Sequence, residues 1–227
     1  MKIRTTEQLQ TVLDEDFVWR RKELSMIFTS IKSSKPKTLS TNLRIGVVIL
    51  YAHWEGFIKN SAEYYLIFVA GKKLTYSELE NNFIALSLKT RLREFELTNK
   101  NTIHTQLIDF LLGNLDVKAS LPTENIIKTQ SNLNSNILKE ILSILGIDYS
   151  QFELKENFID SQLLKIRNSV AHGQDPDITE LDFYELYNEI INIMSSIKNE
   201  ISNNASLVKY KKTSPKTTRF SLPTCHD

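Results

Sequence analysis

The chain has 227 residues, of which 41% are hydrophobic and 24% are charged, and this composition is typical of a globular protein with a sizeable core. Its 28 Lys and Arg residues almost balance its 27 Asp and Glu residues, so the net charge of +1 excludes a global field that would draw the protein to nucleic acid or a membrane. Any affinity for nucleic acid must therefore come from a local site.

The sequence also bears on where the protein works. Cys225 is the one cysteine and has no partner for a disulfide within the chain, which favours a reducing compartment. The N-terminal segment lacks the apolar core of a signal peptide, and the longest apolar stretch, at about 47–52, is too short to cross a bilayer. We therefore expect a cytoplasmic protein with no part in a membrane.

The first part of the chain predicts two long helices. Six Gly and five Pro residues are too few turn signals for an all-β fold, so helices are favoured. The first predicted helix, 6–33, has apolar residues at three- and four-residue spacing and should end before Pro36. The second, 40–69, is apolar nearly all round, as a buried central helix would be, and Gly71 is its expected stop signal.

The rest of the chain predicts further helices and one polar excursion. The excursion, 116–136, contains Pro122 and has no sustained period, so it is typical of a connection in which a small strand or a binding loop could lie. The remaining predicted helices are 76–95, 103–112, 137–145, 156–172 and 179–202. The sequence therefore predicts an all-α, up-and-down helical bundle, with the excursion before its last three helices.

We expect two parts in the chain, a helical domain over 1–204 and a basic, flexible tail over 205–227. The tail lacks a core-forming pattern and is rich in Ser, Thr and Pro. Its basic residues are Lys209, Lys211, Lys212, Lys216 and Arg219. Such a run of lysines is either a solvated surface or a contact to an RNA backbone.

The segment 167–172 (Arg-Asn-Ser-Val-Ala-His) ends the predicted helix 156–172 and carries the candidate chemistry. The apolar stripe of that helix is Ile159, Leu163, Ile166 and Val170. In a regular helix, Asn168 and His172 then lie opposite the stripe and Arg167 lies on its flank. Arg167 and His172 are about 7.5 Å apart along the axis and roughly 140° around it, so one helix does not bring them together. A two-fold symmetric dimer would complete the cleft.

These residue types suit cleavage of RNA by its own 2′-hydroxyl, which attacks the adjacent phosphate. Histidine has an unperturbed pKa near neutrality, so His172 can take or give a proton. Arg167 offers a planar set of donors that can bind two phosphate oxygens while charge develops. Asn168 could orient either His172 or the phosphate. Cleavage of this kind leaves 2′,3′-cyclic phosphate ends.

At these residues the chain resembles the HEPN superfamily, whose signature is Arg, four to six residues, then His, typically with a polar residue after the Arg. It is most similar to the MAE-type branch, near the RiboL-PSP branch, through a second block at 51–57 (Tyr-Ala-His-Trp-Glu-Gly-Phe) and through 167–173. Both blocks occur in the expected order. The resemblance covers the chain from Leu43 to about Ser202.

The resemblance implies a compact helical bundle, a homodimer with a composite active site, and metal-independent cleavage of RNA. It also implies a role as a toxin or effector in toxin–antitoxin systems, abortive infection or anti-phage defence, with an antitoxin or another defence protein as a possible partner. The superfamily also contains members that do not cut, so the alternative is a non-catalytic module that binds RNA, a nucleotide or a defence partner. A purely structural helical adaptor is the third class.

Each candidate residue also has a structural interpretation. His172 could simply cap the carbonyls at the end of its helix. Arg167 could be a surface arginine paired with Asp160 or Asp177. Glu55 could form a helical ion pair with Lys59, although the resemblance leaves room for a supporting role near the cleft.

No metal or cofactor is expected from the sequence. There is no Gly-rich phosphate loop. The other potential metal ligands share no ligand spacing; they are His53, His104, Cys225 and His226. Trp54 lies on the apolar stripe of its helix and is assigned to the core. The sequence thus predicts an endoribonuclease with Arg167 and His172 as catalytic residues, Asn168 in support, and Glu55 as a possible helper.

Overall fold

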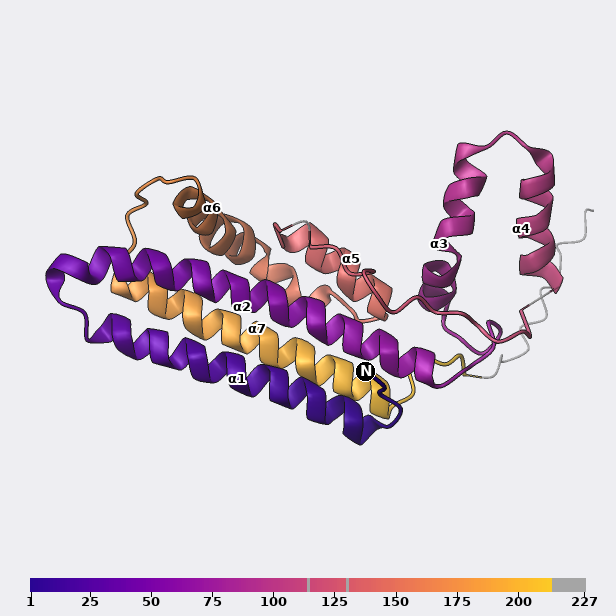
Figure 1. The fold of residues 1–227 in the computed structure, drawn as a ribbon, viewed down its shortest axis with the longest axis horizontal. Helices are drawn as coiled ribbons and strands as arrows, with labels where there is room; N and C mark the ends of the chain where they lie inside the picture. The colour runs from indigo at the N-terminus through magenta and orange to yellow at the C-terminus, as the bar shows by residue number, and fades with distance from the viewer. Residues whose placement is uncertain (114, 130, 214–227) are drawn as a thin grey trace, which may run out of the picture.

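The computed structural model of the chain describes residues 1–113, 115–129 and 131–213, and it has the predicted all-α fold (Figure 1). Within these residues the β-structure is limited to two isolated bridges, Thr75 with Lys118 and Leu79 with Lys211. The α-helices are α1 (Thr6–Lys32), α2 (Pro36–Gly71), α3 (Asn81–Leu97), α4 (Asn101–Gly113), α5 (Ser135–Leu145), α6 (Lys165–Ala171) and α7 (Glu180–Ser206). A 3₁₀ segment (Ser150–Lys155) and a π-helical segment (Phe158–Leu164) precede α6.

The three longest helices, α1, α2 and α7, lie side by side and form the main layer of the bundle (Figure 1). Capping boxes at Thr5 and Thr179 begin α1 and α7, and Pro36 stands at the start of α2, where its missing N–H leaves no hydrogen bond unmade. Trp54 is fully buried among the core side chains of this layer, as the sequence predicts.

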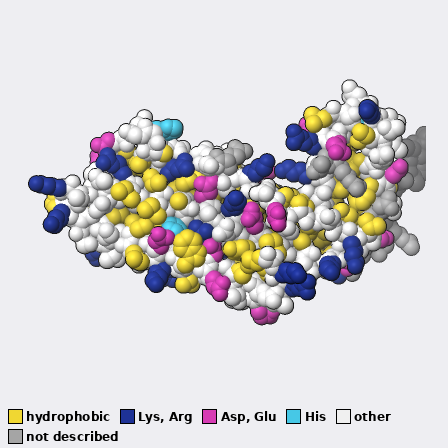
Figure 2. All heavy atoms as spheres, viewed as in Figure 1, with side chains coloured by type: hydrophobic (Ala, Val, Ile, Leu, Met, Phe, Trp, Pro, Cys, Tyr) yellow, Lys and Arg dark blue, Asp and Glu magenta, His cyan; other side chains and the backbone are white. Residues whose placement is uncertain are grey.

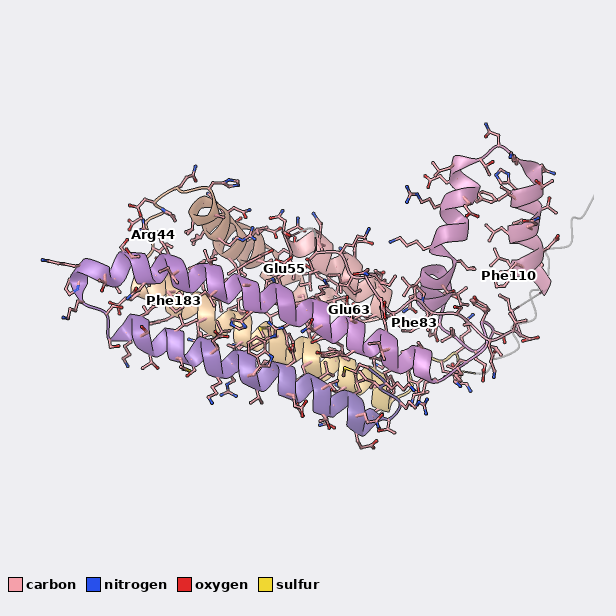
Figure 3. All side chains as sticks on the ribbon, viewed as in Figure 1. Arg44, Glu55, Glu63, Phe83, Phe110 and Phe183 are labelled. Atoms are coloured by element: carbon pink, nitrogen blue, oxygen red, sulfur yellow. The ribbon has the colours of Figure 1, made fainter. Side chains whose placement is uncertain are left out.

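A glycine lets the three long helices approach one another. A Cβ added at Gly46 of α2 would lie 2.6 Å from Cδ1 of Ile31 in α1 and 2.8 Å from the ring of Phe183 in α7. Figure 3 shows Phe183 on α7 behind this part of α2. Gly46 is therefore a close-packing position, at which any side chain would force core groups apart.

The second layer consists of α5 and the helical run that ends in α6, and it lies along one side of α2 (Figure 1). Ile159 and Leu163 are buried as predicted, and Leu164 is buried beside them. Ile166 and Val170, predicted to continue the buried stripe, are only half-buried. The π-helical segment explains this difference, because its wider turn rotates every residue that follows it relative to a regular α-helix.

The hairpin of α3 and α4 projects from one end of the molecule (Figure 1). At its base, the phenol ring of Tyr76 meets the ring of Phe110 edge-on, with 5.0 Å between their centroids. The predicted helix 76–95 begins later than expected, at Asn81. Before that residue the backbone bonds to other segments instead, since Tyr76 N–H donates to Val117 O and Glu80 N–H donates to Tyr210 O.

The start of the expected tail is packed onto the domain. Tyr210 is buried and its ring meets Phe68 edge-on at 5.6 Å. Lys211 Nζ lies 2.9 Å from Glu78 Oε1, and Lys212 N–H donates to Glu78 O. Residues 205–213 therefore belong to the packed domain rather than to a flexible tail. The remainder of the tail, including Lys216, Arg219 and Cys225, lies outside the described residues.

In the part of the chain that the structure describes, no helix is both long and apolar enough to cross a membrane.

Candidate functional site

The segment 167–172 ends the helical run as predicted. His172 follows the last residue of α6, and its backbone N–H donates to Asn168 O at 2.9 Å. Gly173 comes next with φ +75°, a left-handed conformation that glycine adopts without steric cost, and Gln174 N–H then returns to Ser169 O. Helix end and sequence motif therefore coincide, which leaves His172 at the tip of α6.

The Arg167 side chain is half-buried and points to α2. Its guanidinium carbon lies 4.3 Å from the centre of the Tyr51 ring, within cation–π range. Its Nη1 donates to Asn168 Oδ1 at 2.8 Å. Among the described residues, it has no ion pair with any carboxylate, so the proposed pairing with Asp160 or Asp177 is wrong. Asp160 instead accepts hydrogen bonds from Ser135.

Tyr51 is almost completely buried, with 1% of its surface exposed. Its phenol oxygen accepts a hydrogen bond from Leu133 N–H at 2.5 Å, so the excursion between α4 and α5 reaches α2 here. Burial, with a smaller contribution from Glu55, raises the pKa of Tyr51 to about 12 against the opposing effects of Leu133 N–H and Arg167. Tyr51 is therefore a neutral phenol at physiological pH.

Glu55 lies one turn after Tyr51 on α2, where that helix passes beside α5 (Figure 3). Its carboxylate accepts a hydrogen bond from Thr129 Oγ1 of the excursion. The predicted ion pair with Lys59 does not form. The structure thus places Glu55 at the edge of the Arg167 surroundings.

Asn168 contacts different groups from those expected. Its Oδ1 accepts from Arg167, and its Nδ2 donates to Asn132 Oδ1 at 3.3 Å. The expectation that Asn168 points away from the core is wrong, because the π-helical segment turns it towards the excursion. Its side chain holds Arg167 rather than His172.

Three residues of the excursion are the part of the site that sequence reasoning missed. They are Thr129, Asn132 and Leu133. Each bonds to one residue of the Arg167 cluster, which consists of Arg167, Asn168, Tyr51 and Glu55: Thr129 bonds to Glu55, Asn132 to Asn168, and Leu133 N–H to Tyr51. The polar, aperiodic character of 116–136 allowed for a binding loop, but no pattern in it singled out these three residues. Tyr51 had appeared only as part of the aromatic block 51–57.

The His172 side chain stands apart from this cluster. It is exposed and has no hydrogen-bond partner among the described residues. One chain therefore brings Arg167, Asn168 and Glu55 together but does not join His172 to them.

This arrangement offers a cation to an anionic ligand. A guanidinium has five N–H donors, and Asn168 accepts from only one of its nitrogens. Arg44, which precedes Tyr51 on α2, differs from Arg167 because it forms an ion pair with Asp175 in the loop after α6. No group of three or more His, Cys, Asp or Glu side chains in the described ranges is arranged to hold a metal ion.

Comparison with known proteins agrees with the motif. The family model described as RiboL-PSP-HEPN matches residues 15–203, which include all of α2, the excursion and α6. Searches among curated proteins and among solved structures found no match. The HEPN domain is associated with RNase and other RNA-related functions. The match covers most of the chain, and the protein therefore belongs to the RiboL-PSP-HEPN family of the HEPN superfamily.

Proposed function

We propose that this protein is a metal-independent endoribonuclease. Arg167 binds the phosphate that is cleaved, His172 transfers protons, and Asn168 holds Arg167 in place. The observation that carries the proposal is the half-buried Arg167 guanidinium, which lies on an aromatic ring without a carboxylate partner among the described residues. An arginine in such surroundings retains its positive charge and most of its donors for an anion.

In the proposed reaction, the 2′-oxygen of the RNA forms a bond to the adjacent phosphorus and the bond from phosphorus to the 5′-oxygen breaks. One imidazole accepts the proton of the 2′-hydroxyl, and the 5′-oxygen leaves with a proton. Arg167 stabilises the charge that develops on the phosphate oxygens. The products are a 2′,3′-cyclic phosphate and a 5′-hydroxyl.

The proposal includes a homodimer. His172 lies at the exposed tip of α6 and does not contact Arg167 of its own chain. In the proposed dimer, a two-fold axis brings His172 of one copy close to Arg167 of the other. One His172 accepts the proton of the 2′-hydroxyl, and the proton for the 5′-oxygen comes from water or from the second copy of His172. Figure 2 shows Lys and Arg side chains over α5, α6 and the projecting hairpin, where they can contact the RNA backbone.

The biological setting is part of the proposal. We infer from the family that cleavage serves a toxin or effector in a toxin–antitoxin system, abortive infection or anti-phage defence. An antitoxin or another defence protein would then restrain the cleft. The protein is proposed to act in the cytoplasm, where its RNA substrate is found.

The test incubates mixed RNA in EDTA with wild-type protein and with the variants Arg167→Ala, His172→Ala and Arg21→Ala. Arg21 is exposed on α1, so its variant removes one positive charge elsewhere. We expect cleavage by wild type and Arg21→Ala only, with 2′,3′-cyclic phosphate ends on the fragments. Intact RNA after incubation with folded wild-type protein, or full cleavage by His172→Ala, would contradict the mechanism.

A second candidate is a non-catalytic module that binds RNA, a nucleotide or a defence partner through Arg167. The separation of His172 from the Arg167 cluster favours it, since binding needs only the cation. In that case Arg167→Ala loses RNA affinity, while neither wild type nor His172→Ala cleaves RNA.

A further inference from the structure

The surroundings of Arg167 point to a role for Tyr51 that rests on the proposed function. An arginine side chain has many rotamers, and an unpaired cation at a surface would sample them. Arg167 is instead held on two sides, by the Tyr51 ring at 4.3 Å and by Asn168 Oδ1 at 2.8 Å. Neither group is charged, so the guanidinium is fixed without being neutralised.

Both of these groups are anchored to the same segment of the excursion. The Tyr51 hydroxyl accepts from Leu133 N–H, and Asn168 donates to Asn132 Oδ1. Thr129 fixes the neighbouring Glu55. Leu133 and Asn132 therefore connect the excursion to α2 and to α6, next to the contact between Arg167 and Tyr51.

We propose that Tyr51 is a positioning residue, which together with Asn132 and Leu133 holds the Arg167 guanidinium in the orientation that receives an RNA phosphate. Tyr51 itself is buried and does not touch the RNA. It acts through the face of its ring, while its hydroxyl fixes the ring relative to the excursion. A tyrosine is a neutral phenol at physiological pH, so the ring binds Arg167 without adding a negative charge.

The experiment separates binding from cleavage by using a 2′-O-methyl RNA oligonucleotide, which cannot supply the attacking hydroxyl. Its affinity is measured by fluorescence anisotropy for wild type, Tyr51→Leu, Tyr51→Phe, Arg167→Ala and the double variant Arg167→Ala/Tyr51→Leu. Tyr65→Leu is the matched control, because Tyr65 is also a fully buried tyrosine of α2 but is not a contact of Arg167. Thermal unfolding is recorded for every variant.

We expect Tyr51→Leu to weaken binding on the order of 10-fold, the scale of a partly desolvated cation–π contact. Tyr51→Phe keeps the ring face and should stay within about 3-fold of wild type. In the Arg167→Ala background, Tyr51→Leu should cause no further loss, because Tyr51 acts through Arg167. Tyr65→Leu should lower stability without weakening binding.

The outcomes distinguish this inference from the proposed function. If binding depends on Arg167 and Tyr51 but wild type cleaves no RNA, the positioning role stands and the catalytic proposal fails. If wild type cleaves RNA but Tyr51→Leu binds as tightly as wild type, the positioning role is overturned alone. The positioning role is also overturned if Tyr51→Leu lowers the affinity for RNA equally in the wild-type and Arg167→Ala backgrounds. The same holds if Tyr65→Leu lowers the affinity as much as Tyr51→Leu does, or if the affinity does not depend on Arg167.

Discussion

Two arginines on opposite sides of α2 have similar aromatic contacts but different electrostatic surroundings. Arg20 of α1 lies 4.6 Å from the centre of the Trp19 ring, as Arg167 lies 4.3 Å from that of Tyr51. Arg20 also has a carboxylate partner, since its Nε donates to Asp16 Oδ2 at 3.0 Å and both side chains are under 10% exposed. Arg167 has no such partner among the described residues.

The difference separates a structural cation from one available to a ligand. Asp16 also accepts hydrogen bonds from Trp19 and Asn60, so it is fully engaged. Gly56 of α2 makes room for the Arg20 guanidinium, because a Cβ there would lie 2.7 Å from Nη1. The Arg20 pair thus joins α1 to α2, whereas Arg167 forms no ion pair with a carboxylate among the described residues.

The largest expected effect concerns activity. Arg167→Ala and His172→Ala should each lower the rate of RNA cleavage about 10²- to 10⁴-fold, because each removes a group that is proposed to act in the transition state. Their melting temperatures should stay close to that of wild type. Single-turnover cleavage and calorimetry measure the two quantities. A large loss of stability in Arg167→Ala would make it a structural arginine like Arg20.

The next effect concerns stability. Arg20→Ala leaves Asp16 buried without its cation, and we expect the free energy of unfolding to fall by about 3–5 kcal/mol. The double variant Asp16→Asn/Arg20→Met removes both charges and should recover much of this loss. Urea titration measures these values. A loss below about 1 kcal/mol in Arg20→Ala would mean that the pair contributes as little as an exposed one.

A smaller effect depends on pH and on the neighbourhood of Arg20. Burial lowers the pKa of His53 below its usual value, although Glu23 at 3.0 Å opposes this and Arg20 adds to it. His53 therefore binds a proton more readily in the unfolded chain than in the folded one. The contribution of neutral His53 to stability is present above about pH 6.5 and is lost as the pH falls below that value. His53→Gln should flatten the stability profile between about pH 7 and pH 5. An unchanged slope would contradict this assignment.

The smallest effect belongs to an exposed pair. Thr75 N–H and then Lys211 lower the pKa of Glu78 to about 2, so its contribution to stability is present above about pH 4.5 and is lost as the pH falls towards 2. Because the pair is exposed, solvent screens it and the loss should be slight. Melting temperatures of wild type and Glu78→Gln should differ above pH 5 and converge near pH 2. A constant difference would refute the pairing.

Much of the fold follows from the sequence, because long periodic helices are specified locally. The helices α1, α2 and α7 lie close to their predicted ranges, since their apolar spacing repeats over many turns. The π-helical segment could not be predicted from the sequence, because no residue pattern marks the extra residue in its wider turn. The packing of Tyr210 also did not follow, since it depends on Phe68, far away along the chain.

The candidate site was predictable in its motif and not in its contacts. Arg167 and Asn168 were singled out by residue type and spacing, and Glu55 by the resemblance. The structure brings Arg167 and Asn168 into contact, and both Arg167 and Glu55 lie near Tyr51. Their bonds to Thr129, Asn132 and Tyr51 join segments that are far apart in the chain, which a periodic pattern cannot encode. In the proposed dimer, the contact of His172 with Arg167 would depend on two chains, and a pattern within one chain does not specify it.

The most direct test of the account mixes the inactive variants Arg167→Ala and His172→Ala under conditions in which subunits exchange. A mixed dimer retains Arg167 on one chain and His172 on the other, so a cleft built from both chains regains one intact pair. We predict that the mixture cleaves RNA in EDTA and leaves 2′,3′-cyclic phosphate ends. A mixture of exchanged dimers that stays as inactive as each variant, beside an active wild type, would contradict the composite site.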